Sequence, residues 1–326
     1  MRTPSSRFTP ERLILATRAS RLALTQTRLV EAQLRDANPG LETAILEVTT
    51  KGDRDQRPFA EIGYKGLFTS EVERAVVEGR ADVAVHSAKD LTAELGTGCR
   101  LLCIPQRAAR ADVVVGGSGS SAGARLGNLP PGSVVGTSSL RRRALLAEIR
   151  RDVEAVELRG NLDTRLEKVR NGTVHAAILA AAGLERLGVA LDPSMHLDPG
   201  WWVPAPGQGA LAIEALEDRD DLDALFAALA HPATTAELTA ERAFGARLEG
   251  GCSVPLGCSA SVDGTAMSVT GFLGSPSGTS VRERLSGDVS QAAELGVEVA
   301  EAVLLAGGDV ILAEIEGRVA PEIDAP

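Results

Sequence analysis

Arginines recur in this sequence where predicted strands meet predicted helices. The segment Gly136–Arg143 reads Gly-Thr-Ser-Ser-Leu-Arg-Arg-Arg, and Arg159 and Arg165 follow the next strand along the chain. Hydroxyl groups and free backbone N–H groups at a helix start bind anions, and the guanidinium fork matches a carboxylate. Ligands of open α/β sheets bind at the carboxyl ends of the strands. The set predicts a site for a small polycarboxylate or another polyanion, whereas any one arginine alone is typical of a solvated surface ion pair.

The segment His86–Asp90 indicates a second kind of chemistry. It reads His-Ser-Ala-Lys-Asp and directly follows the strand-like run Ala81–Val85, so its polar groups are expected at the carboxyl edge of a sheet. A carboxylate beside a lysine in a cleft can act as a general acid or base, or can stabilise a developing cation. The structural alternative is an Asp90 that caps a helix next to an exposed Lys89.

Cys252 is the third candidate. It follows two glycines, so its thiol is sterically open and suits a nucleophile or a covalent attachment point; a structural loop cysteine is the alternative. The cysteine spacing matches no zinc pattern, and no metal is expected. Cys99 and Cys103 flank an apolar run and are expected to be small buried hydrophobes. The sequence contains neither of the glycine-rich motifs that mark ATP and NAD sites.

The composition is that of an acidic globular protein. The 326 residues include 34 Lys and Arg against 44 Asp and Glu, a net charge of −10, and 3% are aromatic. This balance argues against a nucleic-acid binder and against a platform for stacking single strands. The most apolar stretch, Ala176–Leu184, is too short for a membrane span, and the polar segment Met1–Thr9 lacks the apolar core of a signal peptide. We therefore expect a cytoplasmic protein with no nucleic-acid or membrane partner.

Hydrophobic periodicity predicts an α/β architecture for the first hundred residues. Ser20 is expected to cap a helix that ends at Asn38. Ala210–Glu214, after a Pro/Gly-rich connector, is short and apolar and could return to the first sheet as an added strand. Further strands are expected at Leu13–Ala16, Thr43–Val48 and Ala81–Val85, and a helix at Leu67–Glu78.

A second α/β unit is expected from about Asp112, followed by an α+β unit from about Pro232. The Gly/Ser-rich stretch Gly116–Gly123 predicts a loop. The second unit has expected strands at Val113–Val115, Ser133–Val135, Glu154–Leu158 and Ala176–Ala180, and helices at Leu140–Arg150, Leu162–Asn171 and Gly183–Leu187. The third has expected helices at Ala233–Leu248 and Gln291–Leu305, and strands at Ser259–Val262, Met267–Leu273, Val281–Leu285 and Val310–Glu314.

Seven segments stand out together: Ala16–Leu24, Gly63–Phe68, Ala81–Asp90, Gly136–Arg142, Leu158–Leu166, Pro206–Ala210 and Arg247–Cys252. In this order and spacing they resemble the hydroxymethylbilane synthase family, also called porphobilinogen deaminase, over nearly the whole chain. The resemblance implies a monomeric cytoplasmic transferase (EC 2.5.1.61) of tetrapyrrole and heme biosynthesis. Such an enzyme condenses four porphobilinogen molecules head to tail, with loss of ammonia, and releases 1-hydroxymethylbilane by hydrolysis.

The resemblance also implies a fold and a cofactor. The expected class is α/β with three domains: two α/β lobes like those of periplasmic binding proteins and a small α+β C-terminal domain. Residues 1–106 with 210–228 would form the first lobe, residues 111–205 the second, and residues 230–326 the third domain. A dipyrromethane cofactor, built from two substrate units, would be joined by a thioether to Cys252 of the third domain.

Site residues follow from the same resemblance, matched residue by residue. Asp90 matches the catalytic carboxylate of the family. The expected cofactor-binding residues, besides Cys252, are Ser87, Lys89, Thr137, Ser138, Ser139, Arg141 and Arg142. The expected substrate-binding residues are Arg18, Ser20, Arg159, Arg165, Arg186 and Gln208, and Lys65 and Phe68 lie in an expected lid.

The chain departs from the family pattern in a connector and beside the site. The connector reads Arg107-Ala-Ala-Arg-Ala-Asp112 where the family has Arg-x-Asp-Pro-Arg-Asp, Leu91-Thr92 replaces Val-Pro, and Glu61 replaces a Lys. A non-enzymatic two-lobed protein that binds a small anion is the main alternative, which accounts for the arginines but not for Cys252. A nucleic-acid binder that uses Arg141–Arg143 is a weaker one, and it predicts a broad basic face.

Overall fold

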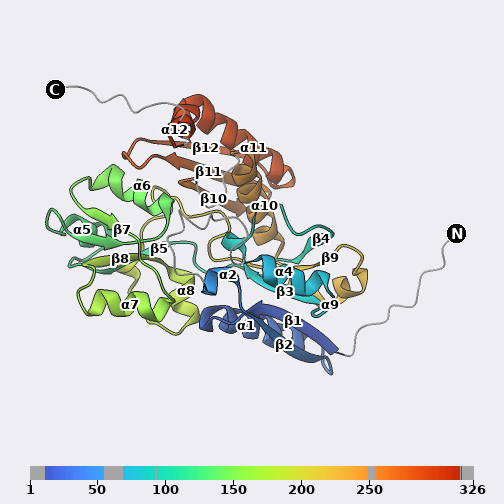
Figure 1. The fold of residues 1–326 in the computed structure, drawn as a ribbon. Coiled ribbons are helices and arrows are strands. Elements are labelled where there is room, and N and C mark those ends of the chain that lie inside the picture. Colours follow the sequence, from blue (N-terminus) through green and yellow to red (C-terminus); the bar gives the residue numbers. More distant parts are fainter. Residues whose placement is uncertain (1–11, 55–68, 93, 249–253, 316, 318–326) are drawn as a thin grey trace. The chain divides into compact units, whose positions relative to one another are not determined.

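The computed structural model describes residues 12–54, 69–92, 94–248, 254–315 and 317. The chain forms two compact units, drawn with their helices and strands in Figure 1. Unit 1 comprises Met1–Arg107 with Ala210–Thr235, and unit 2 comprises Ala108–Gly209 with Ala236–Pro326. The chain therefore passes between the units after Arg107, after Gly209 and after Thr235.

Unit 1 is built on one five-stranded mixed sheet. Its strands are β1 (Arg12–Arg18), β2 (Glu42–Val48), β3 (Val83–Ser87), β4 (Cys99–Cys103) and β9 (Leu211–Leu216), in the order β2-β1-β3-β9-β4. The first three are parallel, and β9 runs antiparallel to β3 and β4. The predicted return of the chain to the first sheet at Ala210–Glu214 is thus confirmed.

Helices cover both faces of the unit 1 sheet. The helices in the described part of unit 1 are α1 (Arg21–Ala37), α2 (Lys51–Arg54), α4 (Ser70–Val77) and α9 (Asp223–Phe226), with the 3-10 turns η1 (Ala88–Asp90) and η3 (Asp220–Leu222). The hydroxyl of Ser20 accepts a hydrogen bond from the N–H of Ala23 at 3.3 Å and begins α1, and Asn38 ends it, as predicted. Apolar residues of α1 pack on one face of the sheet and those of α4 on the other.

Unit 2 contains a four-stranded mixed sheet and its helices. The strands are β5 (Asp112–Gly116), β6 (Val134–Gly136), β7 (Glu154–Val156) and β8 (Ala176–Ala180), in the order β5-β8-β6-β7. Strands β6, β7 and β8 are parallel, and β5 runs antiparallel to β8. The helices are α5 (Ala122–Gly127), α6 (Leu140–Ile149), α7 (Leu162–Arg170) and α8 (Ala181–Arg186), with the turn η2 (Pro193–Met195).

The Gly/Ser-rich segment of unit 2 is shorter as a loop than predicted. The hydroxyl of Ser121 accepts from the N–H of Ala124 and begins α5 inside the stretch Gly116–Gly123. A capping serine therefore outweighs the low helix propensity of Gly123 here.

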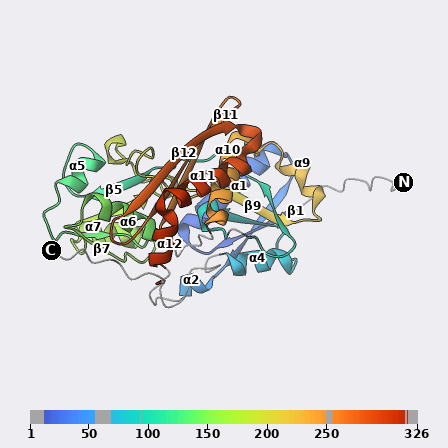
Figure 2. The ribbon, with the colours of Figure 1, turned by 90° about the horizontal axis from the view of Figure 1, so that it is seen from above.

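Unit 2 also contains a three-stranded antiparallel sheet. Its strands β10 (Leu256–Asp263), β11 (Ala266–Gly274) and β12 (Ser280–Asp288) are adjacent in sequence order. Helices α10 (Pro232–Arg247) and α11 (Ala292–Val303) supply apolar residues to the core on this sheet, and Figure 2 shows α11 alongside β12. The chain continues through η4 (Val289–Gln291), η5 (Leu304–Gly308) and α12 (Asp309–Ile315).

The strand predicted at Val310–Glu314 is wrong, because this segment belongs to helix α12. Gly307 adopts a φ of +106° and turns the chain before the helix. Ile311, Leu312 and Ile315 then share the helical spacing that packs them on the core of the three-stranded sheet. A short apolar run has no periodicity of its own that distinguishes a strand from a buried helix.

The three sheets formed by the described residues confirm the predicted class: two α/β lobes and a small α+β C-terminal part. The second and third sheets lie within one compact unit, because α6 contacts β10, β11 and β12. The three domain boundaries derived from the sequence stay a prediction.

Candidate active site

One edge of the unit 1 sheet gathers the first group of candidate residues. Strands β1 and β3 are parallel, with Ala16 opposite Ala84, so their carboxyl ends lie at the same edge. The residues in or just after these two ends are Arg18, Ser20, Ser87, Lys89 and Asp90. This is the edge at which α/β sheets place their ligands.

Neighbouring elements hold the turn η1 that carries Asp90. The N–H of Ala88 donates to the carbonyl of Ala210 at 3.0 Å, and Gln26 of α1 donates through Nε2 to the hydroxyl of Ser87 at 3.0 Å. Lys89 and Asp90 are half-buried on this turn. Ser87 is the N-cap of η1 and Asp90 its last residue, so the alternative of a helix-capping Asp90 is wrong.

The corresponding edge of the four-stranded sheet carries the hydroxyl-rich loop. Thr137, Ser138 and Ser139 follow β6 and lead into α6. The hydroxyl of Ser138 donates to the carbonyl of Leu158 at 2.8 Å, and that of Ser139 accepts from the N–H of Arg142 as the N-cap of α6. The loop therefore fixes the start of the helix from which Arg141 and Arg142 extend.

Asp112 is the centre of a buried network at this edge. It begins β5 opposite Ala180, the last residue of β8, and its side chain is fully buried. Oδ1 accepts from Arg142 at 2.6 Å and from Gln208 at 2.9 Å. Oδ2 accepts from Arg141 at 2.8 Å and from the indole N–H of Trp202 at 2.9 Å.

The two arginines of this network are almost as buried as the carboxylate, with exposures of 3% for Arg141 and 7% for Arg142. Burial alone raises the pKa of Asp112, but the two guanidinium groups outweigh it and hold the pKa well below its usual range. Burial lowers the pKa of Arg141, and the carboxylate of Asp112 counteracts part of that effect. The arrangement thus places two cations on one anion.

Each of these arginines keeps a donor that the described part of the chain does not use. The second amino group of Arg141 donates to the carbonyl of Val203, and that of Arg142 to the carbonyl of Ile178. The Nε–H groups of both are buried and have no hydrogen-bond partner among the described residues. Unused cationic donors beside an excess positive charge suit an anionic ligand.

The remaining candidate arginines of unit 2 lie along the same edge, and they donate hydrogen bonds to partners other than Asp112. Arg159 donates through Nε to Glu157 at 2.7 Å, and Arg165 donates through Nε to the carbonyl of Gly160 at 2.9 Å. Arg186, at the end of α8, donates to the carbonyl of Gly209 at 2.8 Å. Burial lowers the pKa of Arg186.

Two family models cover most of the chain. The model described as "Porphobilinogen deaminase, dipyromethane cofactor binding domain" matches residues 13–224, and "Porphobilinogen deaminase, C-terminal domain" matches residues 235–305. The chain belongs to the porphobilinogen deaminase family. The expected family, transferase activity in tetrapyrrole biosynthesis and dipyrromethane cofactor are thereby confirmed, and a non-enzymatic binder is disfavoured.

Relatives within the porphobilinogen deaminase family match over almost their whole lengths. The porphobilinogen deaminase of Roseiflexus castenholzii is 45% identical over 302 residues, 92% of this chain and 98% of that one. That of Bordetella parapertussis is 44% identical over 307 residues, 94% and 96% of the two chains. Among solved structures, the methionine binding protein MetQ aligns with a TM-score of 0.42 at 12% identity, covering 68% of this chain and 90% of that one.

The donor set of unit 2 fits the dipyrromethane of the porphobilinogen deaminase family. Pyrrole units of this family carry carboxylates, and the unused Nε–H groups of Arg141 and Arg142 are buried cationic donors of the type that binds them. The hydroxyls of Thr137–Ser139 stand at the start of the same helix. These residues could therefore hold the carboxylates of such a cofactor.

Three expected site residues, Cys252, Lys65 and Phe68, lie outside the described residues. The other cysteines behave as predicted for small hydrophobes: Cys99 and Cys103 are buried with exposures of 7% and 3%. Among the described residues, no cluster of His, Cys, Asp and Glu could hold a metal ion. No helix in the described ranges is long and apolar enough to cross a membrane.

Asp112 and Trp202 are the residues of this edge that sequence reasoning missed. In the sequence Asp112 marked only the start of the second unit and the end of the altered connector, and Trp202 carried no prediction. A usable signal was present: a lone acid begins an apolar strand in a unit whose helix start carries two consecutive arginines. Buried arginines require a buried anion, so such an acid is the natural partner.

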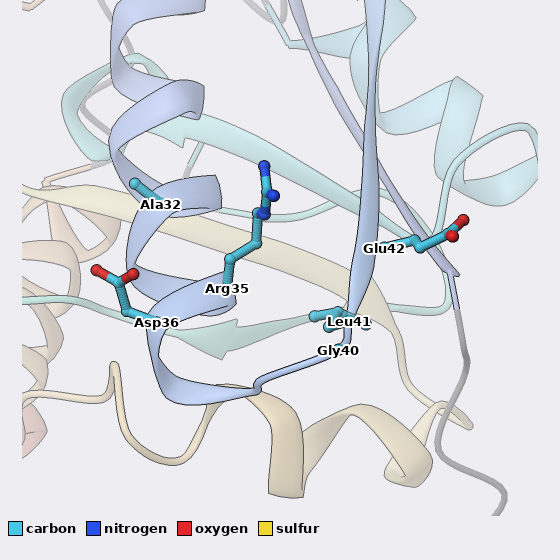
Figure 3. Close-up of a pocket in the computed structure, with 6 residues that line it drawn as sticks. All are labelled: Ala32, Arg35, Asp36, Gly40, Leu41 and Glu42. Atoms are coloured by element: carbon cyan, nitrogen blue, oxygen red, sulfur yellow. The ribbon is translucent and has the colours of Figure 1, made fainter.

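A pocket of about 560 Å³ lies at the other edge of the unit 1 sheet. Arg35, Asp36 and Glu42 line it, between the end of α1 and the start of β2 (Figure 3). Because β2 begins there, the pocket is at the amino edge of the parallel strands, opposite the edge of Asp90. Its position excludes it as the site formed by the strand ends.

Proposed function

We propose that this chain condenses four porphobilinogen molecules head to tail on a dipyrromethane held covalently by Cys252. Ammonia leaves at each condensation, and hydrolysis finally releases 1-hydroxymethylbilane. The observation that carries this proposal is the pair of buried arginines with unused Nε–H donors, in a chain of this family. The bound dipyrromethane supplies the pyrrole ring to which the first substrate is joined.

Asp90 is the proposed catalytic carboxylate. Loss of ammonia from a substrate unit and attack by a pyrrole both develop positive charge on the rings, and a fixed carboxylate stabilises such charge. The support is the hydrogen-bonded turn: Ala210 holds Ala88 and Gln26 holds Ser87, two and three residues before Asp90. The half-buried carboxylate therefore loses little freedom when it binds a pyrrole N–H.

The basic residues have proposed roles as holders of acetate and propionate groups. The cofactor would be held by Arg141, Arg142, Thr137, Ser138 and Ser139, and also by Ser87 and Lys89. Substrate carboxylates would be held by Arg18, Ser20, Arg159, Arg165, Arg186 and Gln208, and Lys65 and Phe68 would belong to a lid. We also propose a cytoplasmic monomer of three domains, with the boundaries given above.

Mass spectrometry of the purified protein tests the covalent part of this proposal. The protein should be heavier than its sequence by one dipyrromethane, Cys252→Ala should lack the extra mass, and the control Cys258→Ala should retain it. An active wild type with an unmodified mass would refute the attachment.

Turnover of porphobilinogen tests the catalytic carboxylate. Asp90→Ala should keep the cofactor mass and a cooperative unfolding transition but lose turnover by about 10²-fold or more, the size typical of a lost electrostatic contact. The control Asp36→Ala removes an exposed carboxylate of the same unit and should turn over normally. Near-normal activity of Asp90→Ala would remove this residue from its role.

A further inference from the structure

Asp112 does more than balance charge, because every hydrogen-bonding position of its carboxylate is used. Each oxygen accepts two donors, one from an arginine and one from a neutral side chain, at 2.6–2.9 Å. Four donors converging on a fully buried carboxylate fix the planes of both guanidinium groups. Their unused Nε–H groups are consequently held in one orientation.

The same carboxylate touches the two segments through which the chain enters and leaves this part of unit 2. Asp112 itself ends the incoming connector, and Gln208 of the outgoing connector donates to both Asp112 and the carbonyl of Arg110. The two connectors also pair directly, because the N–H of Ala108 donates to the carbonyl of Gly209 at 3.1 Å. Asp112 thus connects the two connectors of unit 2 to Arg141 and Arg142.

We propose that Asp112 is a positioning residue that holds Arg141 and Arg142 in the orientation in which they bind the carboxylates of the pyrrole ligand. This inference rests on the function proposed above. Asp112 acts through the arginines and does not itself touch the ligand. Its charge opposes that of a carboxylate ligand, so its benefit to binding comes from geometry alone.

A role in charge and a role in positioning therefore predict opposite effects of the same variant on ligand binding. If Asp112 mattered only through its charge, Asp112→Asn would raise the net charge of the cluster from +1 to +2 and tighten the binding of a carboxylate ligand. If Asp112 positions the arginines, the same variant weakens binding. The amide nitrogen that the variant introduces cannot accept hydrogen bonds, so the two donors that met the replaced oxygen lose their acceptor. If Asp112 served folding alone, the folded holoenzyme would bind as the wild type does.

The experiment compares wild type, Asp112→Asn and the control Asp152→Asn. Asp152 pairs with Arg150 on the surface of the same unit, so its replacement also removes an aspartate–arginine pair. The fraction of freshly purified protein that carries the dipyrromethane mass is measured first for each variant and should fall in Asp112→Asn. KM and kcat for porphobilinogen are then obtained separately, per molecule that carries this mass. We expect kcat/KM to fall on the order of 100-fold in Asp112→Asn, as for a misplaced binding group, and to stay within about twofold in Asp152→Asn.

An unchanged kcat/KM for Asp112→Asn, or a lower KM with unchanged kcat, would overturn the proposal. If Asp112→Asn yields no folded protein, Trp202→Phe takes its place, because it removes one donor to Asp112 and keeps an aromatic ring in the core. A fall of about threefold or more in kcat/KM supports positioning, and any smaller change overturns it. A wild type without cofactor mass or turnover refutes the proposed function itself, which separates the two failures.

Discussion

Glu241 provides a sharp test of how the connectors of unit 2 are held. This residue of α10 is fully buried, and its carboxylate joins two segments distant in sequence. Oε2 accepts from the N–H of Gly207 at 2.7 Å, and Oε1 accepts from the N–H of Ala260 on β10 at 3.0 Å. The variant Glu241→Leu replaces the carboxylate with an apolar side chain of similar size and removes both acceptors.

The expected cost follows from the two backbone donors left behind. A buried N–H without an acceptor costs about 1–3 kcal/mol, so two of them cost about 2–6 kcal/mol. Removal of a buried carboxylate also relieves its desolvation, so we expect the lower half of this range. Glu241→Gln keeps one acceptor oxygen and should lose less stability than Glu241→Leu.

Urea denaturation followed by tryptophan fluorescence measures the loss in the free energy of unfolding of unit 2. The chain has 2 tryptophans, Trp201 and Trp202, and both lie in unit 2. The control Glu298→Gln alters an exposed residue of α11 and should change the free energy of unfolding by less than about 0.5 kcal/mol. If Glu241→Leu stays within about 1 kcal/mol of wild type, the two N–H groups find other acceptors and the reasoning is refuted.

Two further predictions concern a glycine and the buried thiols. Gly209 has a φ of +87°, and a Cβ there would lie 2.5 Å from the carbonyl oxygen of Ala108. In the same urea assay Gly209→Ala should therefore destabilise unit 2 by more than Gly188→Ala does. Gly188 has a similar φ of +74°, but a Cβ there would have no neighbouring atom within 4 Å. Equal losses would show that the close contact is unimportant. Burial raises the pKa of Cys103 to about 12, and burial with the nearby Glu214 carboxylate raises that of Cys99 to about 12. At pH 8 iodoacetamide should leave both unmodified in the native protein and label both in urea, as read by peptide mass spectrometry; native labelling at the rate of a free cysteine would contradict this.

The altered connector has a structural counterpart at Arg110. This residue stands where the related pattern has a proline, which would restrict the backbone by its ring. Here the side chain of Arg110 instead donates to both oxygens of Glu237 on α10, each at 3.1 Å, and to the carbonyl of Ala260. An ion pair with α10 and a hydrogen bond to β10 therefore hold this connector.

Local patterns and motif order were enough for much of the fold and for the family. The two ends of α1, at Ser20 and Asn38, were predictable because caps act on backbone groups within one turn. The order of the segments around Asp90, Arg141 and Cys252 identified the porphobilinogen deaminase family, because such motifs carry their information in adjacent residues. The return of Ala210–Glu214 was predictable because a short apolar segment must be buried against an existing sheet.

The tertiary structure alone decided which groups the arginines hold and how the last helix packs. Asp112 meets Arg141, Arg142, Trp202 and Gln208 across sequence separations of 29 to 96 residues. The local pattern shows a lone acid and two adjacent arginines, but the pairings themselves depend on how β5, α6 and the segments around Trp202 and Gln208 pack together. Val310–Glu314 is helical for a similar reason. A short apolar run does not by itself distinguish a strand from a helix, but a helix places Ile311, Leu312 and Ile315 on the core of the three-stranded sheet. Periodicity and caps operate within a few residues, whereas the partner of a buried charge is chosen by the fold that buries it.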